Sequence, residues 1–160
     1  MIATGLSRDD TFLAFDIATN CGWCVLSGDT YRTGEMACDN PKRLSIFRSL
    51  VVELTNRHRP AVVLAEDVFI NPNPSTKTLL YMHGQLLQLM EQYTGLFSYV
   101  PQATAKAFVA GNGKMTSKQK KAGAMRDALI ARGYDVKGLD AADALAIALT
   151  GRNMLTGAGL

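Results

Sequence analysis

Residues 11–36 of the chain, TFLAFDIATNCGWCVLSGDTYRTGEM, decide the start of the fold. Three short apolar runs lie within them: Thr11–Asp16, Gly22–Ser27 and Tyr31–Met36. Gly28 and Asp29 separate the second run from the third, and two turn-forming residues between strands are typical of a tight hairpin. We therefore predict three strands, of which the second and third pair antiparallel.

Downstream of these strands, helix and strand patterns alternate. Lys42–His58 carries apolar residues at three- and four-residue spacings, which is typical of an amphipathic helix. Ala61–Ala65 (AVVLA) reads as a strand buried on both faces. A second helix is expected over Ser75–Tyr93 and a further strand over Leu96–Val100. Such alternation predicts a parallel part of the sheet with helices packed on it.

The last third of the chain is predicted to be helical. Thr116 is followed three residues later by Gln119, which is the form of a capping box and opens a helix to about Arg132. A final helix is expected from about Asp140 to Thr150. Together the elements predict one α/β domain over residues 11–150, a mixed sheet flanked by helices, with tails at 1–10 and 151–160.

Composition sets only broad limits on function. The 160 residues are 48% hydrophobic and 19% charged, which fits one packed domain. Lys and Arg number 17 against 14 Asp and Glu, so net charge alone is weak evidence for a polyanionic partner. An N-terminus without a signal pattern, the lack of a membrane-length apolar run and an odd number of cysteines lead us to expect a cytoplasmic protein without membrane contact.

Four acidic residues stand out because they interrupt or follow apolar runs. Asp16 closes the first strand and Glu66 follows the central strand, so both are expected at the same edge of the sheet. Asp140 and Asp143 are three residues apart, a spacing that places both on one face of a helix. Capping of the helix start would explain Asp140 without any chemistry. It does not explain Asp143, which lies within an apolar helix.

Converging carboxylates raise the pKa values of one another unless a cation lies between them. Oxygen ligands without a nearby His or thiolate favour Mg²⁺ or Mn²⁺ over Zn²⁺. Two such ions would activate a water and stabilise the leaving oxygen during attack on a phosphodiester. The four acids therefore predict a nuclease with two Mg²⁺ ions, for which Mn²⁺ could substitute.

Three segments carry a family resemblance: FDIATNCGW at 15–23, AEDVF at 65–69 and DAADALA at 140–146. In this order they resemble the acidic motifs of RuvC-like Holliday junction resolvases, and the predicted element order matches their ribonuclease H-like architecture. The resemblance implies a homodimer that nicks opposed strands of a four-way DNA junction. Its metal-binding catalytic acids would be Asp16, Glu66, Asp140 and Asp143. Ile17-Ala18 replaces the Pro-Gly usual in bacterial members, a form similar to phage-borne relatives, which points to a bacterial or phage-infected cell.

A basic group lies around the Gly111-Asn112-Gly113 loop and consists of Lys114, Lys118, Lys120 and Lys121. A solvated helix face is one explanation, and phosphate binding at a helix N-terminus is the other. The resemblance implies a lysine here that assists catalysis, with Lys118 the best match and Lys114 the second. It also implies that Phe69 wedges into the junction. The alternative is that Phe69 is an ordinary core residue.

Other functions fit parts of the sequence. An actin-like or sugar-kinase-like ATPase begins with a similar strand and Asp, but it needs a second domain for which the chain has no room. A YqgF-like nuclease acting on RNA shares the fold and the metal chemistry. A catalytically silent junction-binding protein would give the four acids no reason to converge. Cys21 and Cys24 have the spacing of a redox or zinc pair, yet they lead into a strand and are expected to be small core residues.

Overall fold

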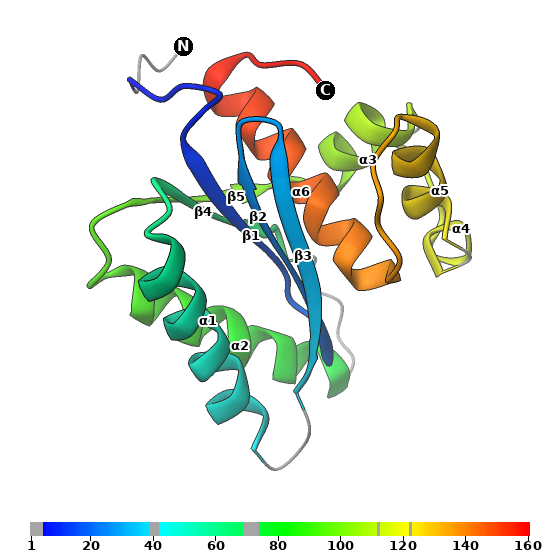
Figure 1. Ribbon diagram of the computed structural model, residues 1–160. Coiled ribbons are helices and arrows are strands. Elements are labelled where there is room, and N and C mark those ends of the chain that lie inside the picture. The colour runs from blue at the N-terminus through cyan, green and yellow to red at the C-terminus, as the bar shows by residue number, and fades with distance from the viewer. Residues whose placement is uncertain (1–4, 39–41, 69–73, 112, 122) are drawn as a thin grey trace.

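The computed structural model describes residues 5–38, 42–68, 74–111, 113–121 and 123–160. Within these residues one mixed sheet forms the centre, with helices on both of its faces (Figure 1). The strand order is β3-β2-β1-β4-β5. The strands are β1 (Thr11–Asp16), β2 (Asn20–Ser27), β3 (Thr30–Ala37), β4 (Val62–Glu66) and β5 (Leu96–Val100).

Strand direction in the sheet follows the predicted order. β1 pairs antiparallel with β2, and β2 pairs antiparallel with β3. β4 lies parallel to β1 on its other side, and β5 lies parallel to β4. The predictions of a hairpin at the start and a parallel part downstream are confirmed. The sheet is therefore mixed, as the sequence predicts.

The central strands are apolar throughout because both of their faces are covered. Every residue of β1 from Phe12 to Asp16 is buried, and so are Val62 to Ala65 of β4. The edge strand β3 is instead mostly exposed, and its side chains include Arg32 and Glu35. Charged residues on an edge strand discourage pairing with another chain.

One face of the sheet is covered by α6 (Leu139–Thr156), which crosses the middle strands (Figure 1). Beyond α6 lie α3 (Gln102–Ala110), α4 (Ser117–Lys121) and α5 (Ala124–Ala131). The core on this face joins Phe12, Leu26 and Leu64 of the strands to the alanine-rich surface of α6. Small side chains therefore let the α6 backbone approach the sheet closely.

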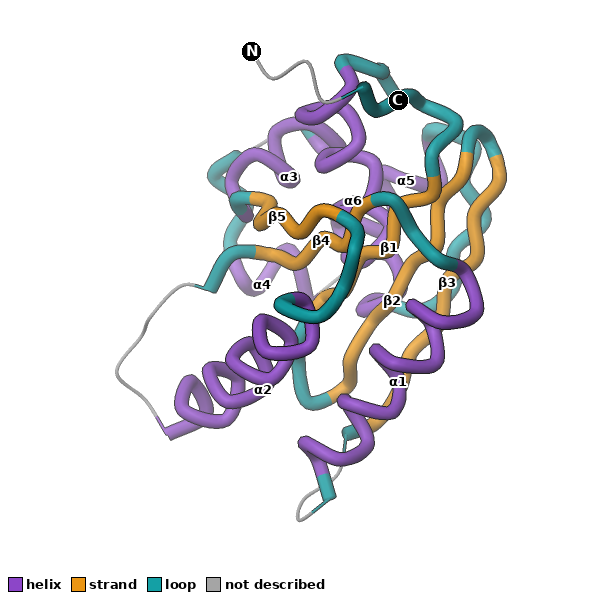
Figure 2. The backbone as a smooth tube through the Cα atoms, turned by 90° about the vertical axis from the view of Figure 1, so that its left-hand side faces the viewer, coloured by secondary structure: helices purple, strands orange, loops and turns teal. Residues whose placement is uncertain are grey.

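The opposite face is covered by α1 (Arg43–His58) and α2 (Pro74–Met90), as Figures 1 and 2 show. Its core is built from bulkier side chains, among them Phe15, Phe47 and Leu50. The Phe15 and Phe47 rings meet edge to face at a centroid distance of 6.1 Å. Both helices were predicted from their apolar spacing, and both predictions are confirmed.

Two helix predictions need correction, and one helix was not predicted. The last helix runs six residues beyond Thr150, because Gly151 and Arg152 are buried and the helix ends at Gly157 in the left-handed conformation. Residues 151–156 are thus part of the packed fold and not a tail. The helix predicted over Thr116 to Arg132 is two helices, α4 and α5, separated before Gly123, whose φ is +92°. α3 was not predicted.

The capping box at Thr116 is confirmed in its details. The Thr116 N–H donates to Gln119 Oε1 at 2.8 Å, and the Gln119 N–H donates to Thr116 Oγ1 at 3.2 Å. Both residues satisfy backbone donors that the start of a helix leaves without partners.

Among the helices in the described part of the chain, none is long and apolar enough to cross a membrane.

Candidate carboxylate site

The site begins with a close contact between β2 and the first turn of α6. Gly22 lies directly opposite Asp16 in the β1–β2 ladder. A Cβ atom on Gly22 would lie 2.0 Å from the backbone oxygen of Asp140 and 2.4 Å from its carbonyl carbon. Only glycine permits this approach. Asp16 and Asp140, 124 positions apart in the chain, therefore come to the same end of the sheet.

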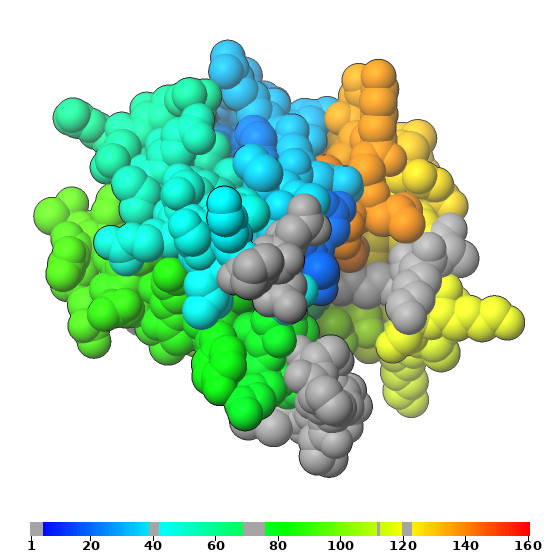
Figure 3. Space-filling view, turned by 90° about the horizontal axis from the view of Figure 1, so that it is seen from below, coloured from blue at the N-terminus to red at the C-terminus, as the bar shows by residue number. Residues whose placement is uncertain are grey.

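Three of the four predicted acids line one cavity of about 340 Å³: Asp16, Asp140 and Asp143. The rest of its wall is formed by Ala18, Gln102, Lys106, Ser117 and Leu139. Asp16 is only 8% exposed, whereas Asp140 and Asp143 are half-buried. In the view onto this end of the molecule, blue residues near the β1–β2 junction lie beside the orange segment that leads into α6 (Figure 3). The spacing prediction for Asp140 and Asp143 is consistent with this shared cavity.

Glu66 lies next to this cavity and not on its wall. β1 and β4 are parallel with Phe15 opposite Ala65, so Asp16 and Glu66 occupy the next positions on neighbouring strands. Glu66 lines an adjoining hollow of about 190 Å³. Gln102 lines both spaces, and its amide nitrogen donates to Glu66 Oε2 at 3.4 Å. One side chain thus connects the fourth acid to the three aspartates.

Lys106 is a site residue that the sequence reasoning missed. Its side chain is only 8% exposed, and its ammonium group donates to Gln102 Oε1 at 3.1 Å and to the Met115 carbonyl at 3.0 Å. It lines the same cavity as the three aspartates. The sequence feature that could have indicated it is a lysine between Ala105 and Ala107, in an otherwise apolar segment. The cavity therefore has a buried lysine on the same wall as its three aspartates.

The predicted DNA-contacting residues lie partly beside this cavity. Lys114 and Lys118 are exposed, and Lys118 follows Ser117, which lines the cavity. Phe69 lies outside the described residues, as do the side chains of Lys120 and Lys121. A role for these residues in binding DNA stays a prediction.

Cys21 and Cys24 are buried and form no disulfide, and the same holds for Cys38. Burial raises the pKa of the Cys21 thiol, and the nearby Cys38 and Asp16 raise it further. Burial also raises the pKa of Cys24. Because a thiolate is the form that binds zinc or attacks a disulfide, these shifts argue against a redox or metal role. The expectation of small core residues is met.

The side chains of the carboxylate cavity decide whether a divalent cation fits there. Among the described residues, no three His, Cys, Asp or Glu side chains are grouped closely enough to count as a ready metal cluster. The three aspartates are spread over one cavity wall, with Glu66 next to it. All of these donors are carboxylate oxygens, the ligands that hard cations such as Mg²⁺ prefer. The donor chemistry therefore fits such an ion.

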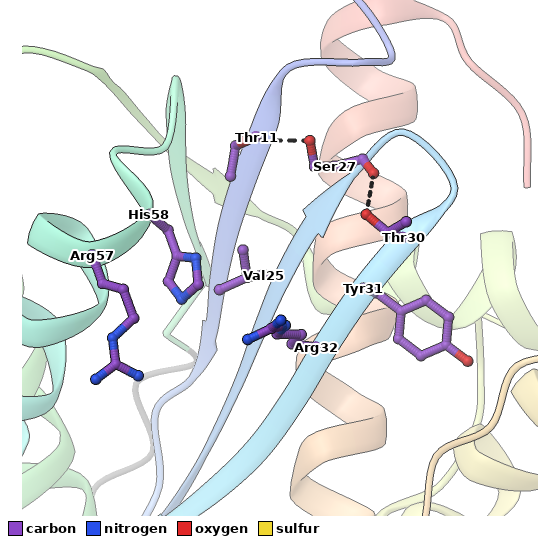
Figure 4. A pocket seen from close by; sticks show the side chains of 8 residues that line it. All are labelled: Thr11, Val25, Ser27, Thr30, Tyr31, Arg32, Arg57 and His58. Carbon is purple, nitrogen blue, oxygen red and sulfur yellow. Dashed lines mark hydrogen bonds between the residues drawn. The ribbon is translucent and has the colours of Figure 1, made fainter.

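A second hollow, of about 510 Å³, lies at the other end of β1 and carries Arg32, Arg57 and His58 (Figure 4). Arg57 pairs with Glu53 at 2.7 Å, and both Arg57 and His58 belong to the last turn of α1, where the helix dipole favours cations. Burial, then Arg57 and Arg32, lower the pKa of His58. None of the four acids lines this hollow, so it is separate from the carboxylate cavity.

The fold and the carboxylate cavity define a ribonuclease H-like α/β protein. More narrowly, the chain belongs to the RuvC family. The family model described as crossover junction endodeoxyribonuclease RuvC matches residues 18–151, a range that contains Glu66, Asp140 and Asp143 and begins two residues after Asp16.

Curated relatives carry the same description. The crossover junction endodeoxyribonuclease RuvC of Paracidovorax citrulli is 34% identical over 131 residues, covering 79% of this chain and 68% of the relative. That of a Sulfurovum species is 30% identical over 141 residues, covering 82% and 87%.

Solved structures share the fold. Thermus thermophilus RuvC in complex with a Holliday junction substrate has a TM-score of 0.69 at 22% identity, covering 91% of this chain and 97% of that one. The fowlpox virus Holliday junction resolvase has a TM-score of 0.57 at 17% identity, covering 90% and 99%.

Proposed function

We propose that this chain is a crossover junction endodeoxyribonuclease, which resolves four-way DNA junctions by metal-dependent hydrolysis of phosphodiester bonds. The observation that carries the proposal is the cavity that Asp16, Asp140 and Asp143 line together in a chain of the RuvC family. Metal dependence belongs to this family of nucleases. That the ion is Mg²⁺, that two ions bind and that Mn²⁺ can replace them are parts of our proposal.

The four acids have assigned roles in this proposal. Asp16, Asp140 and Asp143 would hold the ions, and Glu66 would join them through a small shift past Gln102. Bound metal supplies a water of lowered pKa and stabilises charge on the leaving oxygen. Asp16 is nine-tenths buried, so its carboxylate has few water partners to lose when a cation binds. The carboxylates alone would repel an anionic phosphodiester, so the substrate would need the bound cation in order to approach them.

Two lysines are candidates to assist the chemistry. Lys106 is held by two hydrogen bonds beside the aspartates, so it presents a fixed positive charge toward a phosphate in the cavity. Lys118 is exposed at the start of α4, where a side chain can follow the DNA backbone. We assign charge stabilisation to Lys106 and keep Lys118 as the residue that assists from the DNA side.

The DNA interface is proposed to surround the start of α4. Lys114, Lys118, Lys120 and Lys121 would contact phosphates, and Phe69 would stack in the centre of the junction. Stacking on an unpaired base contributes about 1–3 kcal/mol. Cutting two opposed strands needs two such sites, so we propose a homodimer. Its setting would be the cytoplasm of a bacterial or phage-infected cell.

The test is cleavage of a labelled synthetic four-way junction beside a matched duplex and a matched RNA, each with Mg²⁺ and with chelator. The proposal expects paired nicks in the junction that require metal. Binding without cleavage under both Mg²⁺ and Mn²⁺ would favour the catalytically silent junction-binding protein. Cleavage of RNA alone would favour the YqgF-like alternative.

A further inference from the structure

The first turn of α6 is capped by a side chain from another part of the chain. Gly138 stands at the N-cap position and has no side chain to offer. Instead Glu35 Oε1, on strand β3, accepts the N–H groups of Asp140 and Ala141, both at 3.1 Å. The first N–H groups of a helix lack partners within the helix, and a carboxylate there also meets the positive end of the helix dipole. Glu35 therefore fixes the turn that carries Asp140.

A second side chain connects this cap to the Asp140 carboxylate itself. The Asn20 amide nitrogen donates to Glu35 Oε2 at 3.0 Å and to Asp140 Oδ2 at 2.7 Å. An amide NH₂ has two hydrogens, so both are engaged. The cap alone would need only Glu35. The bond from Asn20 to Asp140 additionally restrains where that carboxylate points.

Two glycines make this arrangement possible. A Cβ atom on Gly138 would lie 2.0 Å from Glu35 Oε1, so any larger residue would push the capping carboxylate away. Gly22, which pairs with Glu35 across the β2–β3 ladder, leaves room for the Asp140 carbonyl. The edge strand, the start of β2 and the first turn of α6 thus meet around one acid of the cavity.

We propose that Asn20 and Glu35 are positioning residues that set the Asp140 carboxylate and thereby the affinity of the carboxylate cavity for its divalent cation. The inference rests on the proposed function only in taking Asp140 as a ligand. Partners that orient metal-binding side chains typically change metal affinity or activity by about 10- to 100-fold when they are removed.

The test uses the full-length chain and the variants Asn20→Ala, Glu35→Gln and Glu35→Ala. Glu53→Gln is the matched control, because Glu53 is an exposed acid on α1 that pairs with Arg57 and lies outside the carboxylate cavity. Binding of Mn²⁺ is followed by electron paramagnetic resonance without DNA. Thermal unfolding and junction binding are measured in chelator, and cleavage is measured with Mg²⁺.

Asn20→Ala keeps the cap, so it is expected to unfold at the wild-type temperature and bind the junction normally in chelator. Its Mn²⁺ affinity should fall by about 10-fold or more, with a matching fall in kcat that added Mg²⁺ partly restores. Glu35→Gln keeps an acceptor oxygen for the two N–H groups, so it should unfold at a higher temperature than Glu35→Ala. It loses the second oxygen, which accepts from Asn20, so its cation affinity should still fall. Glu53→Gln should match wild type in both respects.

Wild-type Mn²⁺ affinity in Asn20→Ala, beside a clear loss in Asp140→Asn, would overturn the inference. So would a wild-type chain that binds no Mn²⁺. If the chain cleaves no junction while Asn20→Ala still weakens Mn²⁺ binding, the proposed function fails and the positioning role stands. The two claims are therefore separable in one set of samples.

Discussion

The helices on the two faces of the sheet differ in the side chains that they bury. α6 buries several alanines, including Ala141, Ala144 and Ala148, and its backbone comes within reach of the β2 backbone at Gly22. On the other face a layer of Phe47, Leu50 and similar side chains separates α1 from the strands. Small residues fix the distance between backbones, whereas large ones bury more apolar area. The carboxylate cavity lies where the packing is closest.

The largest difference between the two faces is expected when a glycine on each is replaced by alanine. Gly22→Ala would place a Cβ atom 2.0 Å from a backbone oxygen that cannot move without α6. We expect a loss of stability of about 1–3 kcal/mol or more and cleavage below detection. Gly84→Ala on α2 meets open space and should gain up to about 1 kcal/mol, because alanine favours a helix. Urea unfolding and junction cleavage measure both.

An equal and small effect of the two glycine variants would mean that α6 can shift without harm to the site. The close approach at Gly22 would then be a packing feature of the fold without a catalytic consequence.

On the α6 side, the role of the cavity can be tested by removing the charge of its buried lysine, Lys106. Lys106→Met keeps an unbranched side chain, one atom shorter, and removes its charge, and we expect cleavage to slow about 100-fold with junction binding nearly unchanged. Lys118→Ala should slow cleavage less and weaken binding modestly, because its side chain is exposed. Single-turnover rates beside binding curves separate the effects. A larger rate loss in Lys118→Ala would move the assisting role to α4.

A core substitution on the bulky face should affect stability and spare chemistry. Phe47 is fully buried against Phe15, so Phe47→Leu is expected to cost about 1–2 kcal/mol in the free energy of unfolding. The cleavage rate per folded molecule should stay at the wild-type value, since α1 does not contribute to the cavity. A rate that falls at a temperature where the variant is fully folded would contradict this division between the faces.

A pH dependence of stability is expected through His83 on α2. Burial lowers the pKa of His83 to about 4, and the nearby Asp67 opposes part of that shift. Above pH 6.5 the ring is neutral in both the folded and unfolded states, so its contribution to stability is fully present. As the pH falls from 6.5 toward 4, the unfolded state takes up the proton first and stability is lost.

The His83 contribution is isolated by comparison with His83→Phe across that pH range. Wild type should lose more stability than the variant on acidification. Parallel stability curves would show that the imidazole takes up a proton in the folded state as readily as in the unfolded one.

Much of the fold was predictable because its central strands are short and continuously apolar. The hairpin at Gly28, the buried strand at Val62–Glu66 and the two helices of the bulky face follow from local patterns. Helix α3 was missed because it is only nine residues long and has few large apolar residues to mark a buried face. Its backbone is held by packing of Ala105 and Val109 against the α6 side of the core. The break between α4 and α5 at Gly123 was missed as well. Gly123 lies beside Leu139, which is distant in sequence.

The four acids could be chosen from the sequence because strand ends and helix spacing are local properties. Three of them share the cavity and Glu66 adjoins it. Asn20 and Glu35 could not be found in this way, because their hydrogen bonds to Asp140 join positions 120 and 105 residues apart. Lys106 likewise gains meaning only when α3 lies beside the aspartates. Positioning residues need the fold before they can be recognised.

The most direct test of the account is a comparison of wild type with Asp16→Asn on the same labelled four-way junction, with binding and cleavage measured in one experiment. The substitution removes one carboxylate of the cavity and one negative charge near phosphate. We expect paired metal-dependent nicks by wild type, and no cleavage by Asp16→Asn at equal or tighter binding. Cleavage by Asp16→Asn at the wild-type rate would contradict the assignment of this cavity as the hydrolytic site.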